Sequence, residues 1–395
     1  MSVRRAIAVL GVVVTLLAGC WAAGDERLPE PVRPEWELAD LPMPPGAPGR
    51  LIVRDVTACA GRWYLVGAVG GPDGGTRPAA WRSADGRGWT PLPLHPISYY
   101  GERAILYAVG CRDGRIAVIG ARAGGAHGNP RVRTWRQDAD GALTEVPAEF
   151  ELYGGPEAVS ASRIAGGAGG WLIAGARESG AAVWRSPDAA GFELVDGAPG
   201  LASDARLTTI ATDALAVPDG WLVGGGGRPA GRADRDPFVW SSGDGRAWTR
   251  LALPATGADE IAQRLVRVGA VVHALGVRGS GFQAWVFEPR AGSATAAGQW
   301  RAVGSFGATG AGAVAGVEAV AGGDGAVLAM TVAAGGHRLW RSAEGGSSWA
   351  PVALPVDVSA GGDTSAAIAV GGGRMVVAID DAAAARVWYA PSGPV

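Results

Sequence analysis

The chain has 395 residues, of which 65 are glycine and 26 are proline, and only 18% are charged. This composition is typical of short strands joined by many turns. The formal net charge of −2 gives no argument for binding nucleic acid or an anionic membrane surface, so we expect no nucleic-acid partner.

Residues 1–19 are interpreted as a signal peptide and excluded from the fold. Arg4 and Arg5 precede the apolar run 6–17, which is too short to span a bilayer comfortably. The run ends in Leu-Ala-Gly-Cys at residues 17–20, which resembles a bacterial lipobox. The resemblance implies that acyl chains are attached to Cys20, that the protein is lipid-anchored outside the cytoplasm, and that residues 20–33 form a tether. The alternative is an ordinary secretory signal with an incidental cysteine.

The rest of the chain repeats one motif, in which two tryptophans flank a short polar turn. Its spacing of 45 to 56 residues predicts a repeat architecture. Clear copies occupy residues 81–89, 240–248 and 340–349, and weaker ones residues 135–141 and 184–192. Each copy predicts a strand, a turn with Asp-Gly or Glu-Gly, and a second strand.

The motif resembles the Asp-box, or BNR, repeat of sialidase-like and sortilin-like β-propellers, whose usual form is Ser-x-Asp-x-Gly-x-x-Trp. Residues 342–349 keep this spacing with Glu at the acidic position, whereas 83–89 and 242–248 are one residue shorter. The resemblance implies a propeller in which these boxes are structural turns. No chemistry is therefore assigned to their acidic residues, Asp85, Asp244 and Glu344.

Counting the strands predicts an all-β fold, a seven-bladed β-propeller over residues 34–395 with four-stranded antiparallel blades. The Trp of the third strand occurs seven times, at Trp81, Trp135, Trp184, Trp240, Trp285, Trp340 and Trp388. The seventh repeat lacks its fourth strand, and residues 36–42 match that strand. We therefore expect this N-terminal strand to close the ring beside residues 386–388, which leaves no open sheet edge.

Two cysteines remain after Cys20, and an even pair in an exported protein favours a disulfide. Cys59 and Cys111 occupy equivalent places in successive repeats, so they should lie at similar height on neighbouring blades. The alternative is two separately buried thiols.

A polar ring is predicted where the innermost strands line the central channel. Aligning these strands brings seven residues to one position: Asp55, Tyr107, Arg163, Asp213, Arg264, Glu318 and Ala367. Six are ionisable in strands otherwise rich in small and apolar residues, and buried charges are costly unless they face water or each other. The ring is either a binding site for a polar ligand or a wet channel whose charges satisfy one another.

The loops on the face where the innermost strands begin add aromatic candidates. Tyr99, Tyr100, Arg103 and Tyr153 should reach this face, where a tyrosine ring suits contact with a sugar or peptide. These tyrosines alternatively serve only to pin long loops.

The predicted function is a non-catalytic binding or scaffold module for a glycan, a peptide or an envelope protein. The main alternative is a sialidase-like glycoside hydrolase or lyase, although the ring lacks a third arginine and the usual Phe/Tyr-Arg-Ile-Pro motif is absent. A third possibility is a structural subunit that binds through its rim. The four histidines show no metal-ligand spacing, so neither a metal site nor a cofactor is predicted.

Overall fold

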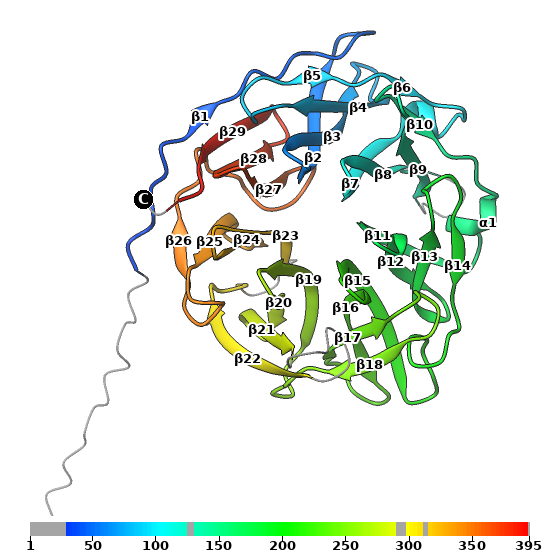
Figure 1. Ribbon diagram of the computed structural model, residues 1–395, viewed down its shortest axis with the longest axis vertical. Helices are drawn as coiled ribbons and strands as arrows, with labels where there is room; N and C mark the ends of the chain where they lie inside the picture. Colours follow the sequence, from blue (N-terminus) through cyan, green and yellow to red (C-terminus); the bar gives the residue numbers. More distant parts are fainter. Residues whose placement is uncertain (1–28, 125–129, 290–297, 311–314, 394–395) are drawn as a thin grey trace, which may run out of the picture.

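The computed structural model describes residues 29–124, 130–289, 298–310 and 315–393 (Figure 1). Cys20, the interpreted signal peptide and most of the interpreted tether lie outside these residues. Among the described residues, none of the helices has the length and apolar character needed to cross a membrane.

Seven β-sheets stand in a ring around a central axis and form a seven-bladed β-propeller, as the repeats predict (Figure 1). Each blade has four antiparallel strands, and blade 2 gains a fifth. In blades 1 to 6 the four strands follow chain order from the axis outward, whereas the outermost strand of blade 7 comes from the N-terminal segment. Blade 1 has β2 (Arg50–Cys59), β3 (Arg62–Gly70), β4 (Thr76–Ser83) and β5 (Thr90–Pro91). Blade 2 has β7 (Ile105–Arg112), β8 (Arg115–Arg122), β9 (Arg131–Gln137), β10 (Leu143–Glu145) and the parallel strand β6 (Leu94–His95).

The next three blades keep the same order. Blade 3 has β11 (Ala158–Gly167), β12 (Gly170–Arg177), β13 (Gly180–Ser186) and β14 (Glu193–Val195). Blade 4 has β15 (Leu207–Val217), β16 (Gly220–Pro229), β17 (Asp236–Ser242) and β18 (Thr249–Ala252). Blade 5 has β19 (Glu260–Val268), β20 (Val271–Arg278), β21 (Gly281–Pro289) and β22 (Gly298–Phe306).

Blades 6 and 7 complete the ring, and two short helices lie in loops that precede blades 2 and 3. Blade 6 has β23 (Gly316–Gly323), β24 (Ala326–Ala333), β25 (Gly336–Ser342) and β26 (Ala350–Val352). Blade 7 has β27 (Ser365–Gly371), β28 (Arg374–Asp380), β29 (Ala385–Pro391) and the N-terminal β1 (Glu37–Leu38). The helices are the 3₁₀-helix η1 (Gly101–Arg103) and α1 (Phe150–Tyr153).

The predicted closure by an N-terminal strand is confirmed. Strand β1 pairs antiparallel with β29, with Glu37 opposite Tyr389. The segment around it also contacts the two neighbouring blades: the Trp36 indole donates to the Ala353 carbonyl of blade 6 at 2.8 Å, and Trp89 N–H of blade 1 donates to the Asp40 carbonyl at 3.2 Å. The attachment begins earlier still, because Val32 pairs with Val352.

The apolar core lies in the seams between blades. Seven clusters of buried side chains occur among the described residues, and each spans two neighbouring blades. Third-strand tryptophans such as Trp81 and Trp240 are fully buried there. Burying such rings between sheets supplies much of the hydrophobic driving force, so the tryptophan content is structural.

The motif between paired tryptophans forms a tight hydrogen-bonded turn. In blade 4 the Ser242 hydroxyl accepts Gly245 N–H at 2.8 Å, and the Asp244 carboxylate accepts the N–H groups of Arg246 and Ala247. Those backbone donors lower the pKa of Asp244, because they stabilise the carboxylate. Gly245 has a φ of +74°, a conformation that favours glycine.

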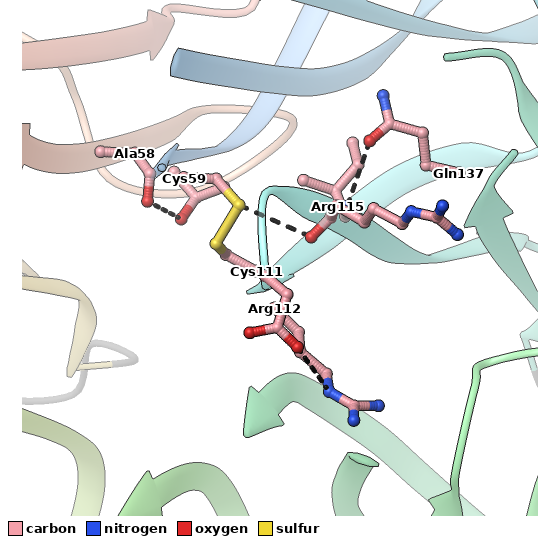
Figure 2. The surroundings of a disulfide bond; sticks show 9 residues. Ala58, Cys59, Cys111, Arg112, Arg115 and Gln137 are labelled. Carbon is pink, nitrogen blue, oxygen red and sulfur yellow. Dashed lines mark hydrogen bonds and ion pairs between the residues drawn. A yellow bond between two sulfur atoms is a disulfide. The ribbon is translucent and has the colours of Figure 1, made fainter. Parts of the chain in front are cut away.

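The predicted disulfide joins blades 1 and 2 (Figure 2). Cys59 ends β2 and Cys111 lies near the end of β7, and their Cα atoms are 5.6 Å apart. The link therefore ties two innermost strands at the lower end of the channel, opposite the face where these strands begin. That face is called the upper face below.

Candidate functional site

The innermost strands carry bulges at the level of the predicted ring. Six of the seven show a register shift against their second strand, and β27 does not. In blade 1, for example, Val53 pairs with Gly67 and Asp55 with Val66, which leaves Arg54 unpaired in the ladder. Each bulge leaves one extra residue of the innermost strand outside the ladder.

The bulges change the predicted ring from one position to two adjacent ones. Asp55, Arg163, Asp213 and Arg264 directly follow the shift, as Ala108 and Ala319 do in blades 2 and 6, whereas Ala367 lies in β27, which has no shift. Tyr107 and Glu318 are instead the extra residues of their bulges. The single aligned position was therefore wrong by one residue in blades 2 and 6, because a sequence alignment cannot see where a strand bulges.

Two of the ring carboxylates link neighbouring blades through backbone hydrogen bonds. Asp55 accepts the N–H groups of Val56 at 3.0 Å and of Val109, in blade 2, at 2.9 Å. Asp213 repeats this arrangement with Ala214 at 2.9 Å and Leu265, in blade 5, at 2.8 Å. Each carboxylate thus has both oxygens engaged.

Burial raises the pKa of Asp55 and of Asp213 above the usual carboxyl range. Opposing this, the Arg163 and Arg264 guanidiniums and the backbone donors stabilise the charged forms of both carboxylates. The pKa of each group is therefore set by a balance within the ring itself.

The extra residues of the bulges make similar links. The Tyr107 hydroxyl donates to the Ala161 carbonyl of blade 3 at 2.5 Å. Gln263 accepts the Val317 N–H of blade 6 at 2.8 Å. Glu318 accepts the Ala366 N–H of blade 7 at 3.4 Å. Most of the polar ring therefore holds blades together, as the mutual-satisfaction alternative expects.

The two ring arginines converge on a carbonyl rather than on a carboxylate. Arg163 Nη2 and Arg264 Nε donate to the Glu318 carbonyl at 2.9 Å and 2.8 Å, respectively, and neither guanidinium forms an ion pair within the described part of the chain. Burial, followed by the charge of Arg163, lowers the pKa of Arg264 to about 10. Arg264 therefore remains cationic at neutral pH, and both guanidiniums stabilise the charged forms of Asp55 and Asp213.

Glu318 also lies beside a buried histidine. His337 Nε2 is 2.9 Å from Glu318 Oε2, and the histidine ring is inaccessible to solvent. Burial lowers the pKa of His337, but the Glu318 carboxylate and the Val358 carbonyl outweigh this effect, so the net pKa is raised. Among described residues, no three His, Cys, Asp or Glu side chains gather in a metal-binding cluster.

The predicted aromatic loop forms a stack at the upper face of blade 2. Tyr99 is 63% exposed, and the Arg103 guanidinium lies 4.0 Å from its ring centroid. The loop is held from below by buried Glu145, which accepts the N–H groups of Ile97 at 2.7 Å and Ser98 at 3.0 Å. Tyr99 therefore projects from a supported loop.

The other two predicted tyrosines are less accessible. The Tyr100 ring meets Tyr99 edge to face at 5.3 Å. Tyr153 is buried against Trp184, and burial raises its pKa. Its hydroxyl contacts Thr134 rather than solvent. Tyr153 thus pins α1 to the seam between blades 2 and 3, and the structure does not bring it together with the channel ring.

A hollow that the sequence did not predict opens on the upper face, where blades 7, 1 and 2 meet. Its volume is about 530 Å³, and we call it the upper hollow. Its lining residues include three arginines, four glycines and two apolar walls: Arg50, Arg54, Arg122, Gly70, Gly71, Gly74, Gly75, Ile52 and Ile105. Strand alternation places Arg50 and Arg54, four residues apart, on one side of β2, but it cannot show that Arg122 of blade 2 lies beside them.

Comparisons with known proteins support the fold alone. No protein-family model and no curated protein matches this sequence. Among solved structures, the β-propeller domain of Myceliophteria thermophila Cps50 (Swd1) is similar, with 14% identity over 91% of this chain and 100% of that chain, and a TM-score of 0.55. A puromycin-hydrolyzing peptidase of Mycobacterium tuberculosis is also 14% identical, over 84% of this chain and 49% of that chain, with a TM-score of 0.51.

A sialidase is among the more distant similar structures. The Hadza microbial sialidase Hz136 is 13% identical over 87% of this chain and 66% of that chain, with a TM-score of 0.47. The matched structures thus include a peptidase, a sialidase and the Cps50 (Swd1) propeller domain.

Proposed function

We propose that this protein is a non-catalytic binding module, held outside the cytoplasm of a bacterial cell by lipid on Cys20, with its ligand site on the upper face. The observation that carries the proposal is that both oxygens of two ring carboxylates, those of Asp55 and Asp213, already accept backbone hydrogen bonds. Glycoside hydrolysis typically needs two carboxyl groups that face the scissile bond, one acting as acid and the other as base or nucleophile. Asp55 and Asp213 instead use both oxygens on backbone N–H groups of their own and the next blade.

The upper face supports binding better than the channel does. The channel arginines already donate to the Glu318 carbonyl. The upper face offers the exposed Tyr99–Arg103 stack and hollows of pocket size between blades. The partner class remains that of the sequence prediction, a glycan, a peptide or an envelope protein.

Two measurements test this proposal. The first is turnover of a panel of fluorogenic glycosides, sialosides included, by the purified full chain. We expect none above the buffer rate, and hydrolysis that is lost in Asp55→Asn or Asp213→Asn would replace the proposal with the hydrolase alternative.

The second is the cellular location of wild type and Cys20→Ala after expression in a bacterium. Wild type should fractionate with membranes and Cys20→Ala should be released. Cys111→Ala serves as the matched control for loss of a cysteine and should stay with the membranes. Release of wild type would contradict the lipid anchor.

A further inference from the structure

We infer that the upper hollow is an oxyanion site, which binds the carboxylate, sulfate or phosphate group of a small ligand. This inference rests on the proposed binding function and names the chemistry that the site would recognise. It does not involve the channel ring.

The first argument is charge. Arg50 Nη1 and Arg54 Nη1 approach the two oxygens of Asp380 at 2.6 Å and 2.7 Å, and the Asp380 side chain is fully buried. Two guanidiniums thus share one carboxylate. Arg122 adds a third cation, which donates to the Thr76 hydroxyl at 3.4 Å and has no ion pair within the described part of the chain. Asp363 is the one carboxylate among the residues that line the hollow, so positive charge remains in excess.

The second argument is preorganisation. Arg54 also donates to the carbonyls of Val53 at 2.8 Å and Asp363 at 3.1 Å, and Arg50 donates to Leu51. Guanidiniums fixed in this way lose little side-chain entropy when they bind, and their planar donor sets suit two-point contact with an oxyanion. Arg50 uses only Nη1 in these bonds, which leaves its other donors for a ligand.

The third argument is space. The volume of about 530 Å³ is in the range of small-molecule pockets. The turn between β3 and β4 keeps one side open: a Cβ atom at Gly74 would meet nothing within 4 Å. Ile52 and Ile105 supply apolar walls. The hollow therefore has room for an anionic group and the body that carries it.

The fourth argument is continuity with the aromatic stack. The Thr76 hydroxyl, which faces Arg122, donates to the Arg103 carbonyl at 2.6 Å. Arg103 in turn lies over Tyr99. A chain of contacts through Thr76 and Arg103 therefore links the hollow to the exposed Tyr99 ring. A ligand with an oxyanion at one end and a ring-shaped body, such as an acidic monosaccharide, would place its oxyanion among the arginines and its body against Ile52 and Ile105.

The test is calorimetric titration of the purified full chain with glucuronate, inorganic sulfate and inorganic phosphate, with neutral glucose as the matched probe. We expect saturable binding of the oxyanions and none of glucose. Arg122→Gln should weaken binding by about tenfold, in line with the loss of one hydrogen bond to a charged group. Arg122→Glu should abolish it. Tighter binding of glucuronate than of sulfate or phosphate would show that the hollow also contacts the sugar ring that carries the anionic group.

Arg62→Gln is the matched control, because Arg62 is exposed at the opposite end of β3 and its loss changes net charge equally. It should bind as wild type does. Thermal melting of each variant without ligand shows that it is folded. Absence of saturable oxyanion binding to wild type, or equal binding by Arg122→Glu, overturns the inference. An adventitious surface effect would appear as an equal loss in Arg62→Gln and also overturns it.

Failure here is distinguishable from failure of the proposed function. Oxyanion binding that Arg163→Gln weakens and Arg122→Glu does not would move the site to the channel and leave a binding module. Glycoside turnover and membrane fractionation are read independently of this titration.

Discussion

Asp213 of blade 4 accepts the backbone N–H of Leu265 of blade 5 at 2.8 Å. In the same way, Asp55 of blade 1 accepts the backbone N–H of Val109 of blade 2 at 2.9 Å. In each pair the acceptor directly follows a bulge, and the donor lies on the adjacent innermost strand. A charge that looks functional in the sequence is thus a lateral link between sheets.

Asp213→Ala should lower the free energy of unfolding by about 2 kcal/mol, because it leaves the buried N–H of Leu265 without an acceptor. Asp219→Ala, in the exposed turn at the other end of β15, is the matched control and should change stability little. Urea denaturation of both variants measures the difference. Equal stability of the two variants would show that the link contributes nothing.

Arg264→Gln should destabilise the protein more at pH 7 than at pH 4. The Arg264 charge opposes the burial that raises the pKa of Asp213 and Asp55. A raised folded-state pKa costs stability only above the unfolded pKa of about 4, where the unfolded carboxyl ionises freely. Without Arg264 that cost grows, so the difference from wild type should widen as pH rises. A difference independent of pH would contradict this electrostatic role.

Removal of residues 1–45 should abolish cooperative unfolding or lower the melting temperature strongly, because it opens the pairing of β1 with β29. The milder Trp36→Ala should cost about 3 kcal/mol through lost packing, besides the bond to the Ala353 carbonyl. Glu35→Ala, at an exposed neighbour, is the control. Differential scanning calorimetry gives the result, and an unchanged melting temperature after truncation would refute closure.

The disulfide predicts a redox-dependent stability. Cys59 and Cys111 are 52 residues apart in sequence, and closing such a loop in the unfolded chain is worth about 4 kcal/mol in the chain-entropy model. We expect no alkylatable thiol at these positions in denatured, unreduced protein, and a lower melting temperature for Cys59→Ala/Cys111→Ala. Two reactive thiols by intact mass would indicate separately buried cysteines instead.

The contact between His337 and Glu318 should make a pH-dependent contribution to the free energy of unfolding. The folded-state pKa of His337 is raised, so the folded protein holds the proton more tightly than the unfolded chain does. Its contribution should be fully present below the unfolded pKa of about 6.5 and disappear as pH rises through the raised folded value. Glu318→Gln should remove this contribution, so the difference in unfolding free energy between wild type and the variant should shrink as pH rises through the folded-state pKa of His337. Parallel curves for the two proteins would exclude the coupling.

The sequence predicts those parts of the structure that repeat from blade to blade. Paired tryptophans and polar turns recur at fixed places, so the blade number, the closing strand at residues 36–42 and the proximity of Cys59 to Cys111 all follow from local patterns. The bulges do not, because no residue spacing in the sequence shows that Arg54 and Tyr107 lie outside the ladder. The upper hollow depends on Arg50 meeting Asp380, a partner 330 residues away.

The division of the core into seven seams has a consequence for how the molecule comes apart. In a closed ring, one opened seam leaves the two sheets within reach of each other, at an effective concentration set by the rest of the ring. No blade is released until a second seam also opens. A substitution that weakens a single seam should therefore have a limited effect, because the opened seam closes again rapidly. Two substitutions that weaken both seams of one blade allow that blade to detach. The spacing of substitutions around the circle, and not only their number, decides the outcome.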